Sequence, residues 1–561
     1  MPALIECVPN FSEGRDPELI RRITDRIQSV EGATLLHVDP GVATNRTVVT
    51  FAGAPEPVLE AAFQAIRTAA ELIDMRNHHG AHPRMGATDV CPLVPLSGIT
   101  LAETAALSRT LAERVGRELG IPVFLYEAAQ ATPTRKNLSV IRAGEYEGLA
   151  EKLRRPEWRP DYGPAEFVPR SGATVIGARD FLVAYNVNLN TTSTRRANAI
   201  AFDVRELGRP KREGHPITGK VVTDAEGQPV MIPGSLKAVK AIGWYIEEYG
   251  VAQVSMNLTD IAVTSLHVAF DEVCRRAEAR GVRVTGSELV GLVPRSALVD
   301  AGRYFLAKQQ RSAGVAESEL IRLAVKSLGL DELAPFDPAE RIIECRLQRA
   351  EDQRLARLTV AGFVDETASE SPAPGGGSVA ALVGAMGAAL GTMVANLSAH
   401  KPGWDDRWEE FSRWAERGQR LKDELVRLMD DDTRAFNQVM LALGMPKGTP
   451  DEKASRKAAL DQANRGAIAV PFRVMQVAAA SFDLLEAMAK SGNPASVSDA
   501  GVGALCARAA VRGAWLNVRI NLPGLADRAS ANTMVSEGEQ LVRASEERER
   551  AILGIVEEKL R

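Results

Sequence analysis

The densest cluster of titratable side chains is the segment NHHGAHPRMGATDVCP at residues 77–92, which holds three of the chain's seven histidines. Glycine and proline residues lie among His78, His79 and His82, so a loop is expected here. An imidazole titrates near neutral pH and can take a proton from an attacking amine, which makes the cluster a candidate general base. A loop whose histidines only support its own turns is the competing interpretation.

A metal site is a further alternative for the same histidines. His78 and His82 have the i,i+4 spacing of zinc ligands on a helix, but the loop-forming residues oppose a helix and the glutamate of HExxH is absent. The five cysteines lie far apart and form no CxxC pair, which indicates neither a zinc site nor a disulfide framework. We therefore expect no metal.

A second group of titratable residues is the run Asp430, Asp431 and Asp432, within a segment of helical periodicity. A carboxylate whose pKa is raised by neighbouring carboxylates can serve as a general acid and base. An acidic run is also common on the solvated face of a helix, and that alternative stays open at this point.

A glycine-rich turn precedes an apolar helix in SPAPGGGSVAALVGAMGAALGTMVANL at residues 371–397. Glycines let backbone N–H groups approach a ligand, and a helix N-terminus favours anions. The turn matches neither a Walker A loop nor a GxGxxG fingerprint, so a tight turn without a ligand is the alternative. No Lys, Arg, Asp or Glu occurs from Ser378 to His400, but Ala and Gly dominate, which favours a closely packed buried helix over a membrane span.

Bulk properties set the protein class. A length of 561 residues indicates several domains, because single cores rarely exceed about 250–300 residues. A net charge of −4 offers no general attraction to nucleic acid. Scattered cysteines and an N-terminal segment without the long apolar run of a signal peptide fit the cytoplasm. We expect a cytoplasmic protein that binds neither nucleic acid nor membrane.

The elements that must position these residues change character along the chain. An alternation of strands and helices gives way, from about residue 350, to segments of helical periodicity only. The pattern predicts a multidomain protein whose N-terminal half is α/β, with two α/β subdomains of mixed sheets flanked by helices, and whose C-terminal domain is an all-α helical bundle. The main expected strands are 3–8, 33–39, 46–52, 122–127, 181–190 and 251–260, and the main C-terminal helices are 376–400, 404–443, 451–489, 495–517 and 528–560.

Composition shifts suggest where these parts meet. We expect subdomains at 1–180 and 181–330, a linker at 331–357 and the helical domain at 358–561. Two further stretches interrupt the pattern with proline, glycine and polar residues. Residues 154–172 are a linker or an ordered binding loop, and residues 209–234 are an inserted surface loop or hairpin.

Long ordered segments of the first half resemble the glutamate formiminotransferase family. They include IECVPNFSEGRD (5–16), LHVDPGVATNRTVVTFAG (36–53) and HHGAHPRMGATDVCPLVP (78–95), and the resemblance covers nearly all of 1–330. It implies transfer of a formimino group from N-formimino-L-glutamate to tetrahydrofolate. The family's catalytic base is the histidine of HPRMGA, which is His82 here. Asp39 is our candidate for the carboxylate that fixes its tautomer, and a turn before Pro40 is the alternative.

The same resemblance implies folate-binding residues. The segment GPAEFVPRSG at 163–172 resembles the family's folate-binding loop, and its prolines with Phe167 and Val168 suit a wall for a flat pterin. Asn10, Arg46 and Arg84 are candidate partners for pterin or carboxylate groups, since guanidinium binds carboxylate bidentately. The loop comprises Gly163, Pro164, Ala165, Glu166, Phe167, Val168, Pro169, Arg170, Ser171 and Gly172. Family members from animals look shorter at 209–234.

The C-terminal part resembles the cyclodeaminase and methenyltetrahydrofolate cyclohydrolase family, which is all-α. The resemblance rests on PAPGGGSVAAL, on residues 430–460 and on KSGNPASVSDAGVGA at 490–504. The family's catalytic acid is the aspartate of DxxAF, which is Asp432 here. Further candidates for this folate pocket are Gly375, Gly376, Gly377, Ser378, Asn493 and Asp499.

Together the two resemblances indicate the bifunctional formimidoyltransferase-cyclodeaminase family. They imply transfer of the formimino group, followed by cyclisation of 5-formimino-tetrahydrofolate to 5,10-methenyltetrahydrofolate with release of ammonia, in histidine degradation and one-carbon metabolism. Tetrahydrofolate, as a polyglutamate, is the implied co-substrate, N-formimino-L-glutamate the other substrate, and a homo-oligomer the implied assembly. The alternatives are a C-terminal methenyltetrahydrofolate cyclohydrolase and a non-catalytic folate-binding scaffold.

Overall fold

A computed structural model describes residues 3–42, 44–80, 83–214, 219–347, 354–525 and 527–561. The chain forms two compact units, Met1–Leu298 with Val325–Leu347, and Val299–Ala324 with Gln348–Arg561. Residues 299–324 thus group with the C-terminal helices, which no composition shift indicated. The expected boundaries near residues 180, 330 and 357 stay predictions.

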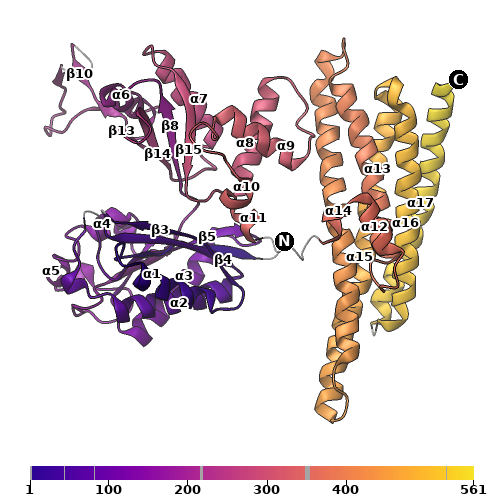
Figure 1. Ribbon diagram of the computed structural model, residues 1–561, viewed down its shortest axis with the longest axis horizontal. Helices are drawn as coiled ribbons and strands as arrows, with labels where there is room; N and C mark the ends of the chain where they lie inside the picture. Colours follow the sequence, from indigo (N-terminus) through magenta and orange to yellow (C-terminus); the bar gives the residue numbers. More distant parts are fainter. Residues whose placement is uncertain (1–2, 43, 81–82, 215–218, 348–353, 526) are drawn as a thin grey trace. The chain divides into compact units, whose positions relative to one another are not determined.

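The first unit begins with a seven-stranded sheet in the order β1-β4-β2-β5-β7-β6, with β3 paired to β4 (Figure 1). β5, β7 and β6 pair in parallel, and the other pairs are antiparallel, so the sheet is mixed as predicted. The strands are β1 (Leu4–Cys7), β2 (Asn10–Phe11), β3 (Ala33–Gly41), β4 (Arg46–Gly53), β5 (Thr88–Ser97), β6 (Val123–Glu127) and β7 (Thr174–Ala178).

Three helices cover this sheet: α1 (Pro17–Gln28), α2 (Pro55–Leu72) and α3 (Leu101–Leu119). Local signals set their starts. Asp16 accepts hydrogen bonds from the first-turn amides of α1, and Thr100 with Glu103 forms a capping box on α3. Their apolar faces and the inner face of the sheet make one core around Ile5, Phe51, Phe63 and Ile66. The histidine-rich loop lies between α2 and β5, so both of its ends are anchored.

A second sheet of the same unit has the order β13-β14-β8-β15, and every pair in it is antiparallel. β13 and β14 form a hairpin, which requires that direction. The mixed character predicted for both sheets therefore holds only for the first. The strands are β8 (Val183–Leu189), β13 (Val239–Ile246), β14 (Val251–Leu258) and β15 (Val284–Val290), and α6 (Thr194–Val204) and α7 (Leu266–Glu278) accompany them.

The segment at 209–234 is folded back on itself in two short ladders. β9 (Arg209–Pro210) pairs with β12 (Met231–Ile232), and β10 (Arg212–Glu213) pairs with β11 (Lys220–Val221). The predicted surface hairpin is therefore confirmed. Gly208 has a φ of 67° at its base, where an added Cβ would lie 1.9 Å from the Ile232 carbonyl oxygen.

The second unit contains the predicted helical bundle. Its helices are α12 (Val360–Thr367), α13 (Gly376–Ala399), α14 (Trp408–Gly444), α15 (Pro450–Ser491), α16 (Val497–Asn521) and α17 (Arg528–Leu560). α13 is the charge-free segment, and its glycines let neighbouring helices approach closely: a Cβ added at Gly384 would lie 3.1 Å from the Ala510 Cβ. α13 and α15 are long and apolar enough to cross a membrane, but the core helix of a soluble protein passes the same test, and 61% of each apolar window is buried inside the protein.

The remaining elements are short or connect the larger ones. They are η1 (Met75–Asn77), η2 (Pro133–Arg135), α4 (Leu138–Arg142), α5 (Leu149–Lys152), η3 (Pro156–Trp158), α8 (Arg295–Lys308), α9 (Glu317–Leu328), α10 (Pro338–Arg341), α11 (Ile343–Leu347), η5 (Leu355–Arg357), η6 (Asp405–Arg407), η7 (Pro494–Ser496) and η8 (Leu522–Gly524).

Candidate active sites

His78 is a buried structural residue of the histidine-rich loop. Its Nε2 donates to the Asn45 carbonyl oxygen at 2.8 Å, and its Nδ1 accepts from Arg84 Nε at 3.2 Å. Both ring nitrogens are therefore occupied. Burial lowers the pKa of His78, which keeps the ring neutral in this role. Of the three histidines in the cluster, His78 is the one that the geometry removes from the candidates for a base.

Arg84 closes one side of a pocket at this loop. Its guanidinium donates to Glu147 Oε1 at 2.7 Å and to Glu145 Oε2 at 3.2 Å, and its side chain is only 7% exposed. The pocket has a volume of about 450 Å³ and is lined by His79, Gly80, Arg84, Gly144, Glu145 and Glu147. His82, two residues after Gly80 in sequence, lies outside the described residues. In this structure Glu145 and Glu147 accept the hydrogen bonds of the Arg84 guanidinium. The role of Arg84 as a partner of a substrate carboxylate therefore stays a prediction.

The predicted folate-binding loop at 163–172 runs beside the histidine-rich loop. The Ala87 amide donates to the Ser171 carbonyl at 2.8 Å, and the Met75 amide donates to the Arg170 carbonyl at 2.9 Å. Gly172 has a φ of 66°, and a Cβ there would lie 2.2 Å from the Met85 carbonyl oxygen. Two segments that are some eighty residues apart in sequence are thus held together by backbone contacts.

Asn10 and Arg46 are also brought together. Arg46 Nη2 donates to Asn10 Oδ1 at 2.5 Å, and burial lowers the pKa of Arg46 to about 10. Asp39 lies on β3 opposite Val48 and is exposed, so it belongs to a strand rather than to the turn considered as its alternative. Whether Asp39 orients His82 stays a prediction.

Asp89, at the start of β5 directly after this loop, is a residue that the sequence analysis missed. Its carboxylate is fully buried, accepts from the Met85 amide at 3.0 Å and pairs with Arg142. It therefore fixes the conformation of the loop that carries Arg84. The aspartate stands in the quoted segment at 77–92, but nothing in its spacing pointed to Arg142.

A further charged pocket of about 540 Å³ lies at the C-terminal ends of β6 and β7. Burial raises the pKa of Glu127 and of Asp180, and a second carboxylate, Asp260, raises that of Asp180 further. Arg179 and Lys240 also line this pocket. No motif in the sequence placed these residues together.

In the second unit, Asp432 lies against the glycine-rich start of α13. Ser378 Oγ is 3.0 Å from Asp432 Oδ2, 3.0 Å from the Met429 carbonyl oxygen and 3.1 Å from Thr433 Oγ1. The Ser378 backbone amide also donates to the carboxylate. A Cβ at Gly377 would lie 2.2 Å from Asp432 Oδ1, so only glycine leaves room for this carboxylate.

Burial raises the pKa of Asp432, and the hydrogen bonds from Ser378 oppose that shift. We expected neighbouring carboxylates to raise this pKa, and that physical reason was wrong: burial is the cause, and neither Asp430 nor Asp431 is among the groups that shift it. The glycine-rich turn suggested that the N-terminus of α13 binds an anionic ligand. The anion that lies there is the protein's own Asp432 carboxylate.

The other two aspartates of the run are structural. Asp430 is buried and accepts from the backbone amides of Leu355 at 2.8 Å and Ala356 at 3.2 Å, which ties η5 to α14. Asp431 pairs with Arg434 on the partly exposed face of the same helix. The alternative of a solvated acidic surface therefore applies to Asp431 alone.

Asn493 and Asp499 do not share a site with Asp432 within this chain. The Asn493 amide donates to Ser398 Oγ at 2.7 Å, and Ser398 lies twenty residues after Ser378 on α13, or about 30 Å along the helix. The prediction that they line the same pocket is wrong for one chain, because the long helix separates them. Asn517 is closer: a Cβ at Gly376 would lie 3.3 Å from its Nδ2.

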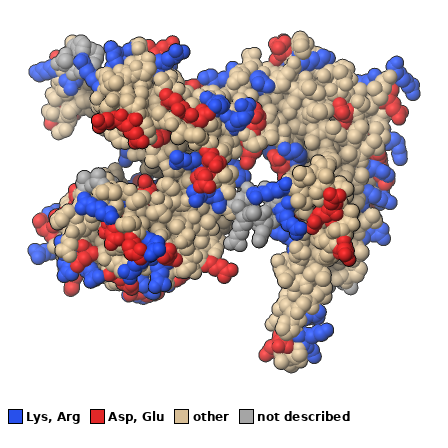
Figure 2. Space-filling model, viewed as in Figure 1, with Lys and Arg blue, Asp and Glu red and all other residues tan. Residues whose placement is uncertain are grey.

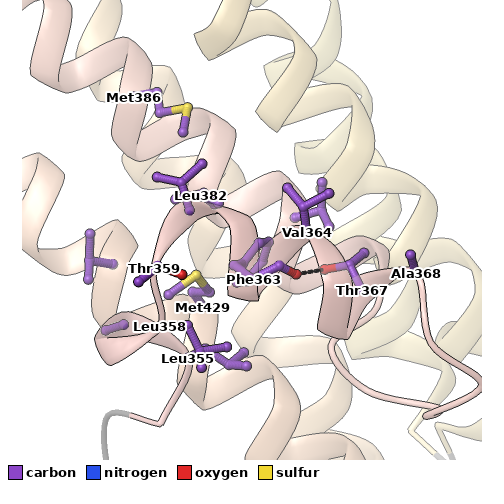
Figure 3. A pocket seen from close by; sticks show the side chains of 14 residues that line it. Leu355, Leu358, Thr359, Phe363, Val364, Thr367, Ala368, Leu382, Met386 and Met429 are labelled. Carbon is purple, nitrogen blue, oxygen red and sulfur yellow. Dashed lines mark hydrogen bonds between the residues drawn. The ribbon is translucent and has the colours of Figure 1, made fainter.

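An apolar pocket of about 520 Å³ lies between α12, α13 and α14 (Figure 3). Its walls come from Phe363, Leu382, Met386 and Met429, and the Thr367 hydroxyl is turned back to the Phe363 carbonyl at 2.8 Å. None of its lining residues is titratable. The pocket therefore offers no group that could move a proton.

Among the residues that the structure describes, no group of three or more His, Cys, Asp or Glu side chains is placed to hold a metal ion.

Comparison with known proteins gives three family matches. Residues 4–179 match the N-terminal subdomain of the formiminotransferase domain, residues 184–348 match the formiminotransferase domain, and residues 359–540 match formiminotransferase-cyclodeaminase. The chain is 44% identical to formimidoyltransferase-cyclodeaminase of Mus musculus over 528 residues, which is 94% of each chain.

Two further relatives each match only one part of the chain. Glutamate formimidoyltransferase of Streptococcus pyogenes is 42% identical over 306 residues, covering 54% of this chain and 94% of that protein. Methenyltetrahydrofolate cyclohydrolase of Methylorubrum extorquens is 42% identical over 184 residues, covering 33% of this chain and 88% of that protein.

Proposed function

The chain belongs to the formimidoyltransferase-cyclodeaminase family, and from that premise we propose which side chains move the protons of its two reactions. The N-terminal half transfers the formimino group from N-formimino-L-glutamate to tetrahydrofolate. The C-terminal domain then cyclises 5-formimino-tetrahydrofolate to 5,10-methenyltetrahydrofolate and releases ammonia. The match to a bifunctional relative along 94% of both chains favours this pair of activities over a cyclohydrolase or a non-catalytic scaffold.

In the transferase reaction, His82 is the proposed base. Nitrogen-5 of the folate loses a proton as it attacks the amidine carbon, and the departing glutamate nitrogen needs one. A single imidazole can take the first proton and supply the second. Two observations support this site: both nitrogens of His78 are already occupied, and His79 and Gly80, which precede His82 by three and two residues in sequence, line a pocket. The loop at 163–172 beside it is the proposed pterin wall.

In the cyclisation, Asp432 is the proposed acid and base. Nitrogen-10 attacks the amidine carbon and must lose its proton, while the nitrogen that leaves as ammonia must gain one. The two demands balance, so one carboxylate can carry the same proton from nitrogen-10 to the leaving nitrogen. The observation that carries the assignment is the place of the Asp432 carboxylate, which lies against Gly377 and Ser378 at the glycine-rich start of α13. Burial raises its pKa, which suits it to both halves of that transfer.

Ser378 is proposed as a positioning residue for Asp432, rather than as a residue that contacts folate. Its side chain is fully buried and its hydroxyl group reaches Asp432, Thr433 and the Met429 carbonyl. The hydroxyl has one proton, so it donates to one of these three oxygens at a time. This arrangement holds the carboxylate over Gly377.

The finer points rest on the family resemblance alone. We propose that tetrahydrofolate is used as a polyglutamate, that the protein is a homo-oligomer and that it acts in the cytoplasm. Neither reaction is proposed to use a metal ion, because a protonated amidine is already an electrophile.

The assignment is tested by measuring both reactions on full-length variants. Asp432→Asn should lower the rate of ammonia release from 5-formimino-tetrahydrofolate by about 100- to 10,000-fold, the usual contribution of a general acid–base group, while formimino transfer continues. His82→Ala should do the reverse. Full ammonia release by Asp432→Asn, or loss of both activities in either variant, would contradict the proposal.

A further inference from the structure

The folded segment at 209–234 and helix α6 enclose a pocket that neither reaction uses. Its volume is about 190 Å³. Drug-sized ligands occupy pockets of about 300–1,000 Å³, so this one suits a smaller molecule. Its lining residues are Arg195, Asn198, Ala199, Phe202, Arg209, Pro210 and Arg212.

The pocket carries an excess of positive charge. Three of its lining residues are arginines. Asp203, the ion-pair partner of Arg209, is shared: Arg209 Nη1 lies 3.2 Å from Asp203 Oδ1, and Arg280 pairs with the other oxygen. Asp203 is only 5% exposed, so its one charge is committed to these two guanidinium groups. One positive charge of that trio remains unbalanced.

The other two arginines add to this charge. Arg212 Nη1 donates to the Gly219 carbonyl oxygen at 2.7 Å, a neutral partner that leaves the charge in place. Arg195 lies exposed in the first turn of α6, and within the described part of the chain no carboxylate lies within ion-pair distance of it. In the space-filling view, Lys and Arg side chains gather over the part of the molecule that Figure 1 labels β10 (Figure 2).

The walls of the pocket are preorganised. The Asn198 amide group is bonded in both directions to the backbone of Gly243, at 2.9 and 3.0 Å, so it holds α6 against β13. Arg205 stacks over the Phe202 ring at 4.1 Å. Arg209 and Arg212 stand on the two ladders β9–β12 and β10–β11, which fix their backbones. A rigid frame lowers the entropy cost of gathering several cations around one ligand.

We propose that this pocket binds a small anion with at least two negative charges on phosphate or carboxylate oxygens. The planar guanidinium fork matches both groups bidentately, and three forks around a small space favour a multiply charged ligand over a single carboxylate. Two of the three arginines come from the 209–234 segment, so the ligand fastens that segment to α6. This site shares no residue with either proposed active site.

The experiment uses the full chain and two probes, inorganic pyrophosphate and citrate, at constant ionic strength, since exposed charges are screened by salt. Calorimetry measures the affinity of each. Hydrogen exchange of the backbone at residues 209–214 measures the fastening. The proposal expects saturable binding of at least one probe and slower exchange in its presence. The preferred probe distinguishes a phosphate ligand from a carboxylate ligand.

Variants decide whether the pocket is the site. Arg195→Ala and Arg212→Ala should each weaken binding about tenfold or more, the value of one hydrogen bond between charged groups. Lys211→Ala is the matched control: it removes the same charge from the same hairpin, but Lys211 is exposed and does not line the pocket. All three variants should retain both enzymatic rates.

Absence of saturable binding by both probes at millimolar concentration overturns the proposal. Equal weakening by Lys211→Ala overturns it too, because the binding would then be non-specific attraction to a basic surface. Neither result would affect the assignments of His82 and Asp432, which are tested by activity.

Discussion

At the scale of single residues, Asp430, Asp431 and Asp432 have three different roles because successive side chains on a helix point about 100° apart. Asp430 points to the backbone of η5, Asp431 to Arg434 and Asp432 to Gly377. The difference in chemistry follows from burial and partners rather than from residue type. Only Asp432 combines a raised pKa with a place at the glycine-rich turn.

The hydroxyl of Ser378 gives a prediction on pH dependence. Its hydrogen bond favours the ionised form of Asp432, so Ser378→Ala should raise the pKa of that carboxyl further. If the ionised carboxylate is the base that starts cyclisation, the acidic limb of the kcat/KM profile for ammonia release moves to higher pH. As the pH falls, the Ser378→Ala variant should therefore lose ammonia release at a higher pH than the unsubstituted protein does.

The matched control for this prediction is Ser398→Ala. Ser398 is a buried serine on the same helix, and its hydroxyl donates to the Val394 carbonyl at 2.6 Å. Its removal should lower stability without moving the pH profile. An unchanged profile in Ser378→Ala would refute a positioning role for that hydroxyl.

The pair Gly377 and Gly376 gives a second prediction at this scale. An added methyl at Gly377 must displace the Asp432 carboxylate, which lies 2.2 Å away, so Gly377→Ala should abolish ammonia release and spare formimino transfer. At Gly376 the nearest atom is 3.3 Å away, on the flexible side chain of Asn517. Gly376→Ala should therefore retain most of the activity, and assays of both reactions on both variants check this. Equal activity of the two alanine variants would mean that Asp432 is free to move.

At the scale of elements, close packing of long helices decides the structure of the second unit. Glycines on α13 and α14 have no Cβ, so side chains of the neighbouring helices fill the space that a Cβ would take. Gly418 on α14 is one such point, where an added Cβ would lie 2.0 Å from Thr392 Oγ1 and 2.8 Å from Leu484 Cδ2.

Gly418→Ala should therefore destabilise the protein by about 1–3 kcal/mol, the usual cost of overpacking a core. Gly466→Ala on α15 is the comparison, since nothing lies within 4 Å of its added Cβ, and alanine there should add up to about 1 kcal/mol through helix propensity. Urea denaturation followed by circular dichroism measures both. The same change in stability for both variants would contradict the packing argument.

At the scale of the whole molecule, two reactions that share an intermediate reside on one chain. The candidate sites belong to separate compact units, each with its own core. Relatives that match only one half are proteins with one activity in their names. Because one chain carries both sites, the second site is present at a high effective concentration near the first, whichever path the intermediate takes.

Mixing two full-length variants tests whether the sites are independent. His82→Ala can only cyclise and Asp432→Asn can only transfer, so an equimolar mixture should release ammonia from N-formimino-L-glutamate and tetrahydrofolate. Neither variant alone should do so. A coupled ammonia assay should show a lag while 5-formimino-tetrahydrofolate accumulates, and a mixture that stays inactive although each variant keeps its own reaction would contradict free exchange of the intermediate.

The fold class could be predicted from the sequence because periodicity and capping are local. The period of the apolar residues distinguished the α/β half from the helical half, and Asp16 and Thr100 mark helix starts by their types alone. The candidate residues came from long family motifs. These motifs identify Asp432 and Ser378 as candidates, but they do not predict that the two side chains are in contact.

Only the tertiary structure decided which of these residues meet. Asn493 and Ser378 stand in equally specific motifs, yet they lie at opposite ends of α13, whereas Asp432 and Ser378 are 54 positions apart in sequence and in contact. Hydrogen-bond and ion-pair partners likewise separated Asp432 from its two neighbours and took His78 out of the catalytic candidates. The physical reason is that residue type and spacing determine local conformation, while contact, desolvation and hydrogen-bond partners depend on how distant helices and strands pack.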